Sequence, residues 1–171
     1  MSCKLKNSNS GYSLVEMLVY VGILSLVSLI VINMLFSYTK TYQTLGALRV
    51  AENSGLDSME RMTRDIRGAT SVDSSNSTLG TSPGVLTLTS TSGGVSTTTK
   101  FYVQSGILKV DINGTYSGPL TISNASTTSL TFRLLTNSVS NAVKIDMTVQ
   151  AAVGSVVKAK NYHSTIILRG K

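Results

Sequence analysis

A single carboxylate stands at the start of a long apolar run near the N-terminus. The segment Gly11-Tyr12-Ser13-Leu14-Val15-Glu16 is followed by Met17–Phe36, a stretch without a charged residue. An ionised carboxylate at the centre of a membrane-spanning helix costs about 2.5–3.5 kcal/mol on insertion scales, and such residues are generally functional. Glu16 therefore needs a partner. Since the sequence places no obvious cation beside it, we expect that partner to lie in another molecule.

The apolar run has the length of a membrane-spanning helix. As an α-helix, Met17–Phe36 would extend about 30 Å, which is one hydrocarbon thickness. Lys4 and Lys6 precede it, and basic residues follow more sparsely. This asymmetry predicts a single pass in the cytoplasmic (inner) membrane, with the N-terminus in the cytoplasm and the C-terminal domain outside it. A secretory signal peptide fits poorly, because the run is too long and no A-x-A-like cleavage site follows it.

The same segment resembles the class III signal of type IV prepilins and type II secretion pseudopilins. The resemblance rests on a short basic leader that ends in Gly11, an apolar opening, the glutamate Glu16 and the uninterrupted span. It implies that a prepilin peptidase/N-methyltransferase cuts after Gly11 and methylates Tyr12, where the family mostly has phenylalanine. It also implies that Glu16, then the fifth residue, pairs with the N-terminal amine of a neighbouring subunit and sets the filament's register.

The resemblance implies further partners and a destination. The subunit would contact membrane lipid and other pilins or pseudopilins. An inner-membrane assembly platform with its ATPase would then extract it into a pilus or pseudopilus.

Composition, sequence pattern and the resemblance to prepilins together divide the chain into five expected segments. These are a cleaved leader (1–11), a transmembrane and polymerisation helix (12–38), an amphipathic helix (39–69), a loop (70–84) and a β-sheet head domain (85–171). No proline occurs before Pro83, so one helix can run from about Ser13 to Ala69. Apolar residues at three- and four-residue steps predict a helix face packed under a sheet. That predicted face consists of Leu45, Leu48, Leu56, Met59, Met62, Ile66 and Ala69.

Two local features modify the amphipathic helix. Gly46 and Gly55 each weaken it by up to ~1 kcal/mol relative to alanine, which predicts a bend there. Two acid-before-base pairs at i,i+4 spacing, Asp57–Arg61 and Glu60–Arg64, predict ion pairs worth a few tenths of a kcal/mol each.

Alternating β-branched segments follow the loop and predict strands. They are Val85–Ser90, Thr97–Val103, Ile107–Ile112, Leu120–Ser123, Ser129–Leu135, Ala142–Ala151 and Val156–Leu168. Ser105-Gly106 and Asn113-Gly114 predict turns, the second one a hairpin. The expected core residues are Phe101, Leu108, Phe132 and Ile167. One long helix followed by repeated strands predicts an α+β, pilin-like fold with an antiparallel sheet on the distal half of the helix.

The sequence holds no recognisable catalytic constellation, so we expect no enzyme, no cofactor and no metal site. His163, the only histidine, lies in a predicted strand without a nearby Cys or Glu. The stretch Asp111–Gly114 lacks the ligand spacing of a calcium loop, so a hairpin turn is expected there. The only cysteine, Cys3, lies in the leader and would be absent from a processed chain.

A second resemblance narrows the class. Met62–Ala69 is similar to the arginine–aspartate stretch that closes the long helix in J-type minor pseudopilins and W-type minor pilins. The order of the later segments resembles that branch too. Many major pilins carry a distal cysteine pair, and this sequence has none. The resemblance implies a minor pilin or pseudopilin, a structural subunit of a type IV pilus-like or type II secretion filament.

Two alternatives stay open at this point. An uncleaved bitopic membrane anchor would keep its leader and would not need Glu16. A DNA-uptake (competence) pilin would bind duplex DNA through a basic head, with Lys158 and Lys160 as candidate contacts. From Thr70 onward the sequence contains eight Lys or Arg and three Asp. The basic residues are scattered singly, which makes DNA the less favoured partner.

Overall fold

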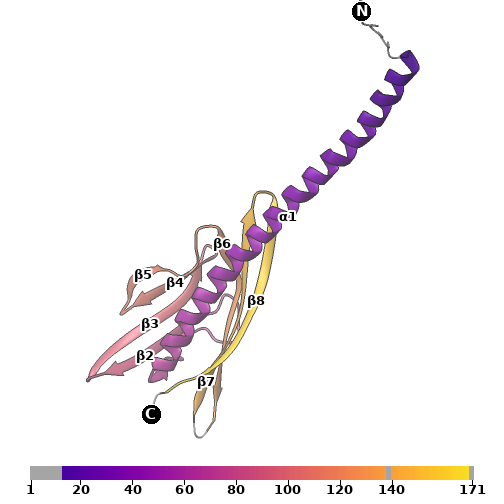
Figure 1. Cartoon of the computed structure of the whole chain (residues 1–171). Coiled ribbons are helices and arrows are strands. Elements are labelled where there is room, and N and C mark those ends of the chain that lie inside the picture. The colour runs from indigo at the N-terminus through magenta and orange to yellow at the C-terminus, as the bar shows by residue number, and fades with distance from the viewer. Residues whose placement is uncertain (1–12, 138–139, 170–171) are drawn as a thin grey trace, which may run out of the picture. The chain divides into compact units, whose positions relative to one another are not determined.

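The computed structural model describes residues 13–137 and 140–169. They fall into two compact units, the first ending at Thr41 and the second beginning at Tyr42. One helix, α1 (Leu14–Gly68), contributes to both units, and all the strands belong to the second (Figure 1). A long N-terminal helix followed by antiparallel sheets is the α+β, pilin-like layout predicted from the sequence, and that prediction is confirmed.

The second unit contains two antiparallel sheets. The five-stranded sheet consists of β1 (Ser71–Val72), β2 (Leu86–Ser92), β3 (Val95–Gln104), β4 (Ile107–Ile112) and β5 (Thr115–Pro119). The three-stranded sheet consists of β6 (Ala125–Thr136), β7 (Asn141–Val153) and β8 (Val156–Ile167). In each sheet the strands follow one another in sequence order, so every connection joins neighbours.

Two short turns set the register of the five-stranded sheet. Ser105 and Gly106 have φ angles of 53° and 76°, and Asn113 and Gly114 have 53° and 78°. Positive φ at both central residues is the pattern of a two-residue type I′ hairpin, which matches the twist of the flanking strands. Both turns predicted from the sequence are therefore confirmed.

The strand predicted at Leu120–Ser123 is wrong. After the Asn113-Gly114 turn the chain pairs at once as β5, so the strand occupies Thr115–Pro119 instead. The segment that follows is tied to α1. Ser58 Oγ donates to the Leu120 carbonyl at 3.2 Å, and the Ile122 amide donates to Ser54 Oγ at 3.4 Å.

The core prediction is correct at three positions and wrong at one. Phe101, Leu108 and Phe132 are fully buried, whereas Ile167 is 61% exposed and Ile166 is 3% exposed. In the register of β8 on β7, Ile166 lies opposite the buried Val143. Because side chains alternate across a strand, a shift of one residue moves the apolar side chain to the opposite face.

The helix face that packs on the sheets is built largely from small residues. Its buried positions in α1 are Ala47, Ala51, Ser54, Gly55, Ser58, Met62 and Ile66. The predicted face is wrong at Leu45 and Leu56, which are 51% and 54% exposed. Arg61 pairs with Asp65 at 2.8 Å rather than with Asp57. Small side chains let backbone and sheet approach closely, so the buried face here follows size rather than hydrophobicity alone.

Gly55 provides space rather than a break in the helix. α1 continues uninterrupted through Gly46 and Gly55. A Cβ atom at Gly55 would lie 2.3 Å from the ring of Tyr162. The Tyr162 hydroxyl donates to the Ala51 carbonyl at 3.1 Å, which holds the ring over the helix. A glycine is therefore required where the Tyr162 ring of β8 packs on α1.

We expect Gly55→Ala to lower the free energy of unfolding by about 1–3 kcal/mol, because the Tyr162 ring must move and lose its hydrogen bond. Gly46→Ala is the matched control. There a Cβ would sit 3.6 Å from Val153, an ordinary contact, and alanine should stabilise the helix by up to ~1 kcal/mol. Denaturant unfolding of the full chain in detergent measures both. Equal effects of the two substitutions would contradict this account of the interface.

Candidate processing and assembly site

Glu16 lies in the first turn of α1, two residues after the helix begins at Leu14. The Met17 amide donates to the Ser13 carbonyl at 3.2 Å, so Ser13 occupies the N-cap position that serine favours. The partial positive charge of a helix N-terminus favours an acidic residue here. The other two predicted site residues, Gly11 and Tyr12, lie outside the described residues.

Glu16 has a hydrogen-bond donor within its own chain. The Tyr20 hydroxyl donates to Glu16 Oε1 at 3.3 Å, one helical turn away, and both side chains are exposed. We expected no partner within the chain, so this contact is a correction, and the i,i+4 spacing of Glu and Tyr was the signal that could have revealed it. A hydroxyl solvates a carboxylate but does not neutralise it. Among the described residues Glu16 forms no ion pair.

The helix around this carboxylate is apolar on all sides. It contains an 18-residue window of mean hydropathy 2.5, none of which is buried within the protein. Large side chains such as Leu18, Leu24 and Phe36 are about two-thirds exposed. A helix of this length and composition can cross a membrane, and it presents apolar surface that nothing in the described chain covers.

An exposed apolar helix with one acid near its start, joined to an antiparallel β unit, defines a pilin-like class of subunit. A comparison with protein-family models matches residues 6–32 to the prokaryotic N-terminal methylation motif. The chain thus carries the N-terminal motif of the type IV pilin family. No curated protein and no solved structure matches the chain.

The motif supports a type IV pilin-like precursor that is processed by prepilin peptidase and assembles with other pilins. The matched range includes Gly11, Tyr12 and Glu16. Together with the apolar helix, it points to membrane anchoring and pilus assembly.

His163 takes part in a surface hydrogen bond on the three-stranded sheet. Its Nδ1 lies 2.7 Å from Asp146 Oδ1, and its side chain is 65% exposed. The hydrogen bond from His163 is the main cause that lowers the pKa of Asp146. Within residues 13–137 and 140–169, no three His, Cys, Asp or Glu side chains are grouped closely enough to hold a metal ion.

Side-chain oxygen atoms near the Asn113-Gly114 turn accept hydrogen bonds from the neighbouring strand β3. Asn113 Oδ1 accepts the Thr98 amide at 2.8 Å, and Asp111 Oδ1 accepts the Tyr102 hydroxyl at 3.1 Å. The segment considered as a calcium loop is thus a hairpin whose polar side chains are already bonded.

Lys160, one of the two lysines considered for DNA contact, forms an ion pair within the protein. Its ammonium donates to Glu52 Oε1 on α1, and this hydrogen bond is the main cause that raises the pKa of Lys160. Because the charge is matched within the protein, Lys160 adds little to an electrostatic surface for phosphates.

Proposed function

We propose that this protein is a minor pilin or pseudopilin, a structural subunit of a type IV pilus-like or type II secretion filament. The observation that carries the proposal is the lone carboxylate Glu16 on an exposed apolar helix, within the matched motif. Cleavage after Gly11 makes Tyr12 the N-terminus, which the same peptidase methylates. The subunit waits in the inner membrane with its leader in the cytoplasm, before an assembly platform and its ATPase extract it.

Charge compensation explains why the N-terminal amine of one subunit and the Glu16 carboxylate of its neighbour form a pair. Cleavage leaves an α-ammonium at Tyr12, with a reference pKa near 8. In a bundle of apolar helices an unpaired charge is costly, so the amine of one subunit pairs with Glu16 of its neighbour. The Tyr20 hydroxyl orients the Glu16 carboxylate through its hydrogen bond. Because this hydroxyl is neutral, it leaves the carboxylate charge to be matched by the amine.

The division of labour along the chain follows from this proposal. Residues 1–11 are the removed leader, 12–38 the membrane and polymerisation segment, 39–69 the stem, 70–84 a connecting loop and 85–171 the head. The similarity of Met62–Ala69 to J- and W-type subunits, and the lack of any cysteine beyond Cys3, favour the minor-pilin or pseudopilin role over that of a major pilin.

Processing is tested by the intact mass and N-terminal sequence of the membrane-extracted protein, with and without prepilin peptidase. We expect a chain that begins at Tyr12 only when the peptidase is present, heavier by one methyl group where Tyr12 is modified. Gly11→Val should block cleavage. Gly22→Val is the control, because Gly22 has open space around it and lies beyond the cleavage point. A full-length chain in peptidase-positive cells would make the protein a plain membrane anchor.

The role of Glu16 is tested by filament incorporation. We expect Glu16→Gln and Glu16→Ala to be processed normally but to lose incorporation at least a hundred-fold, since removing one partner of a buried ion pair costs about 3–5 kcal/mol. Tyr20→Phe should reduce incorporation less, and Tyr38→Phe, another exposed tyrosine of α1, should leave it unchanged. Normal incorporation of Glu16→Gln would show that the carboxylate merely reaches the membrane surface.

A further inference from the structure

The two sheets have four edge strands, and three of them are protected from further pairing. An edge strand presents unpaired N–H and C=O groups, so most proteins shorten, bend or cover such edges. β1 has two residues, and β5 has five, ends in Pro119 and pairs through a shifted register. The outer edge of β6 is covered by residues 80–84. The Gly80 amide donates to the Phe132 carbonyl, and the Gly84 amide donates to the Leu130 carbonyl, both at 2.7 Å.

β8, the fourth edge strand, is long and regular. All 12 of its residues pair with β7 without a shift in register, and the strand contains no proline. Just beyond it, the Leu168 amide donates to the Asn141 carbonyl of β7 at 2.9 Å. Since bonded residues alternate in an antiparallel pair, the even-numbered residues of β8 bond β7 and the odd-numbered ones direct their N–H and C=O groups to the free edge. These odd-numbered residues are all exposed: Val157, Ala159, Asn161, His163, Thr165 and Ile167.

The free edge of β8 lacks the usual charged protection. None of its six outward residues carries a fixed charge, whereas Lys158 and Lys160 belong to the set that bonds β7. Within the described part of the chain, no backbone hydrogen bond from another element reaches the edge between Val157 and Ile167. The edge is therefore open to a further strand along its whole length.

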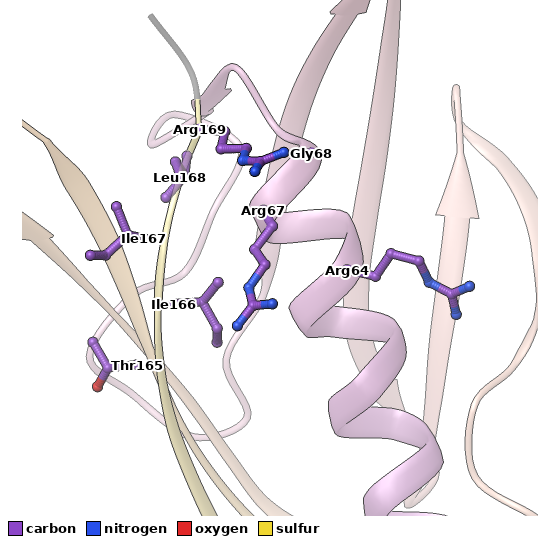
Figure 2. A pocket seen from close by; sticks show the side chains of 8 residues that line it. All are labelled: Arg64, Arg67, Gly68, Thr165, Ile166, Ile167, Leu168 and Arg169. Carbon is purple, nitrogen blue, oxygen red and sulfur yellow. The ribbon is translucent and has the colours of Figure 1, made fainter.

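The far end of this edge opens into a basic hollow beside the C-terminus of α1. The hollow has a volume of about 680 Å³, and the end of β8 from Thr165 onward forms one of its walls (Figure 2). Arg67 points towards Ile166 from the helix, and Arg169 extends towards the helix end (Figure 2). The Arg169 amide donates to the Arg67 carbonyl at 3.3 Å, so the free edge ends here. Among the described residues neither guanidinium belongs to an ion pair, so the hollow offers two unmatched positive charges.

We propose that the free edge of β8 binds an extended segment of a partner protein by strand addition. The segment runs antiparallel to β8, which is the more stable arrangement, and its main chain supplies most of the contact. Its side chains are uncharged along Val157 to His163 and acidic where its N-terminal end passes Arg67 and Arg169. Charge complementarity at the hollow then selects the direction and register of the partner.

A second copy of this chain fits the edge poorly. In an antiparallel pair of two β8 strands centred on the free edge, Lys158 of one copy would lie near Arg67 and Arg169 of the other. Like charges at that point oppose the pairing. The partner is therefore a different polypeptide. This contact goes beyond the proposed function, since it uses neither cleavage after Gly11 nor the charge of Glu16.

Peptide binding to the full chain in detergent tests the strand addition. The probe is a labelled peptide as long as β8 that alternates Thr and Val and carries glutamates at its N-terminal end, followed by fluorescence anisotropy. We expect saturable binding. Methylation of one alternate set of peptide amides should abolish it, and methylation of the other set should not, because only one set faces the edge. No binding at about 1 mM peptide, or equal loss with both methylated peptides, would overturn the proposal.

A proline in the free edge tests the same contact from the protein side. Ala159→Pro removes an amide that does not bond β7, and an edge strand tolerates proline at such a position. We expect it to weaken peptide binding at least about ten-fold, whereas Ala159→Val, which keeps the amide, should bind normally. Denaturant unfolding checks that both variants are folded. Normal binding by folded Ala159→Pro would refute the strand addition.

Charge reversal in the hollow tests the acidic end of the partner. Arg67→Glu combined with Arg169→Glu should weaken binding of the acidic peptide about ten-fold and favour a peptide with lysines in place of the glutamates. Arg133→Glu, an exposed reversal on β6, should change neither. Equal effects of the two reversals would contradict the assigned charge of the partner.

Sedimentation of the full chain without peptide distinguishes the remaining occupant. Self-association that Ala159→Pro abolishes, without any peptide binding, would place a second copy at the edge and overturn the proposal. None of these measurements depends on processing or filament incorporation, so their failure leaves the proposed function standing.

Discussion

One helix serves two environments, and this constraint organises the rest of the protein. α1 has 55 residues, and its most apolar window is not buried by any other part of the described chain. An apolar surface of that extent is stable only in lipid or against other apolar helices. The second part of the same helix is covered on one face by sheets that the remaining sequence builds. The second unit therefore buries its own apolar core, whereas the apolar start of α1 has no cover within the described chain.

The covered part of α1 depends on residue size as much as on hydrophobicity. Ala47, Ala51 and Gly55 bury little area, but they let the sheets approach the backbone closely. Tyr162 uses this space, since its ring covers Gly55 and its hydroxyl donates to the Ala51 carbonyl. Larger apolar residues at Leu45 and Leu56 remain on the outside. The helix thus keeps an outward face on which both leucine and charged side chains are exposed.

The fold class could be predicted from the sequence because its strongest signals are local. The uncharged run, the absence of proline before Pro83 and the Asn113-Gly114 turn each act within a few residues, and the structure agrees with all three. The errors lie where tertiary register decides. Ile166 rather than Ile167 is buried because of the pairing of β8 with Val143 of β7. Amphipathic spacing likewise gave a leucine-rich face for α1, because periodicity alone cannot weigh a large residue against a small one at a close contact.

In the candidate site, Glu16 could be predicted from the sequence, but its hydrogen bond with Tyr20 was not predicted. Glu16 is conspicuous because it stands alone before the apolar run, whereas Tyr20 reads as one more member of that run until the helix places its hydroxyl 3.3 Å from the carboxylate. This contact sharpens the electrostatic argument. A neutral donor lowers the cost of holding the carboxylate in an apolar environment, but the negative charge remains and still calls for a cation. On the proposed function, the Tyr20 hydroxyl orients the carboxylate until the amine of another subunit pairs with it.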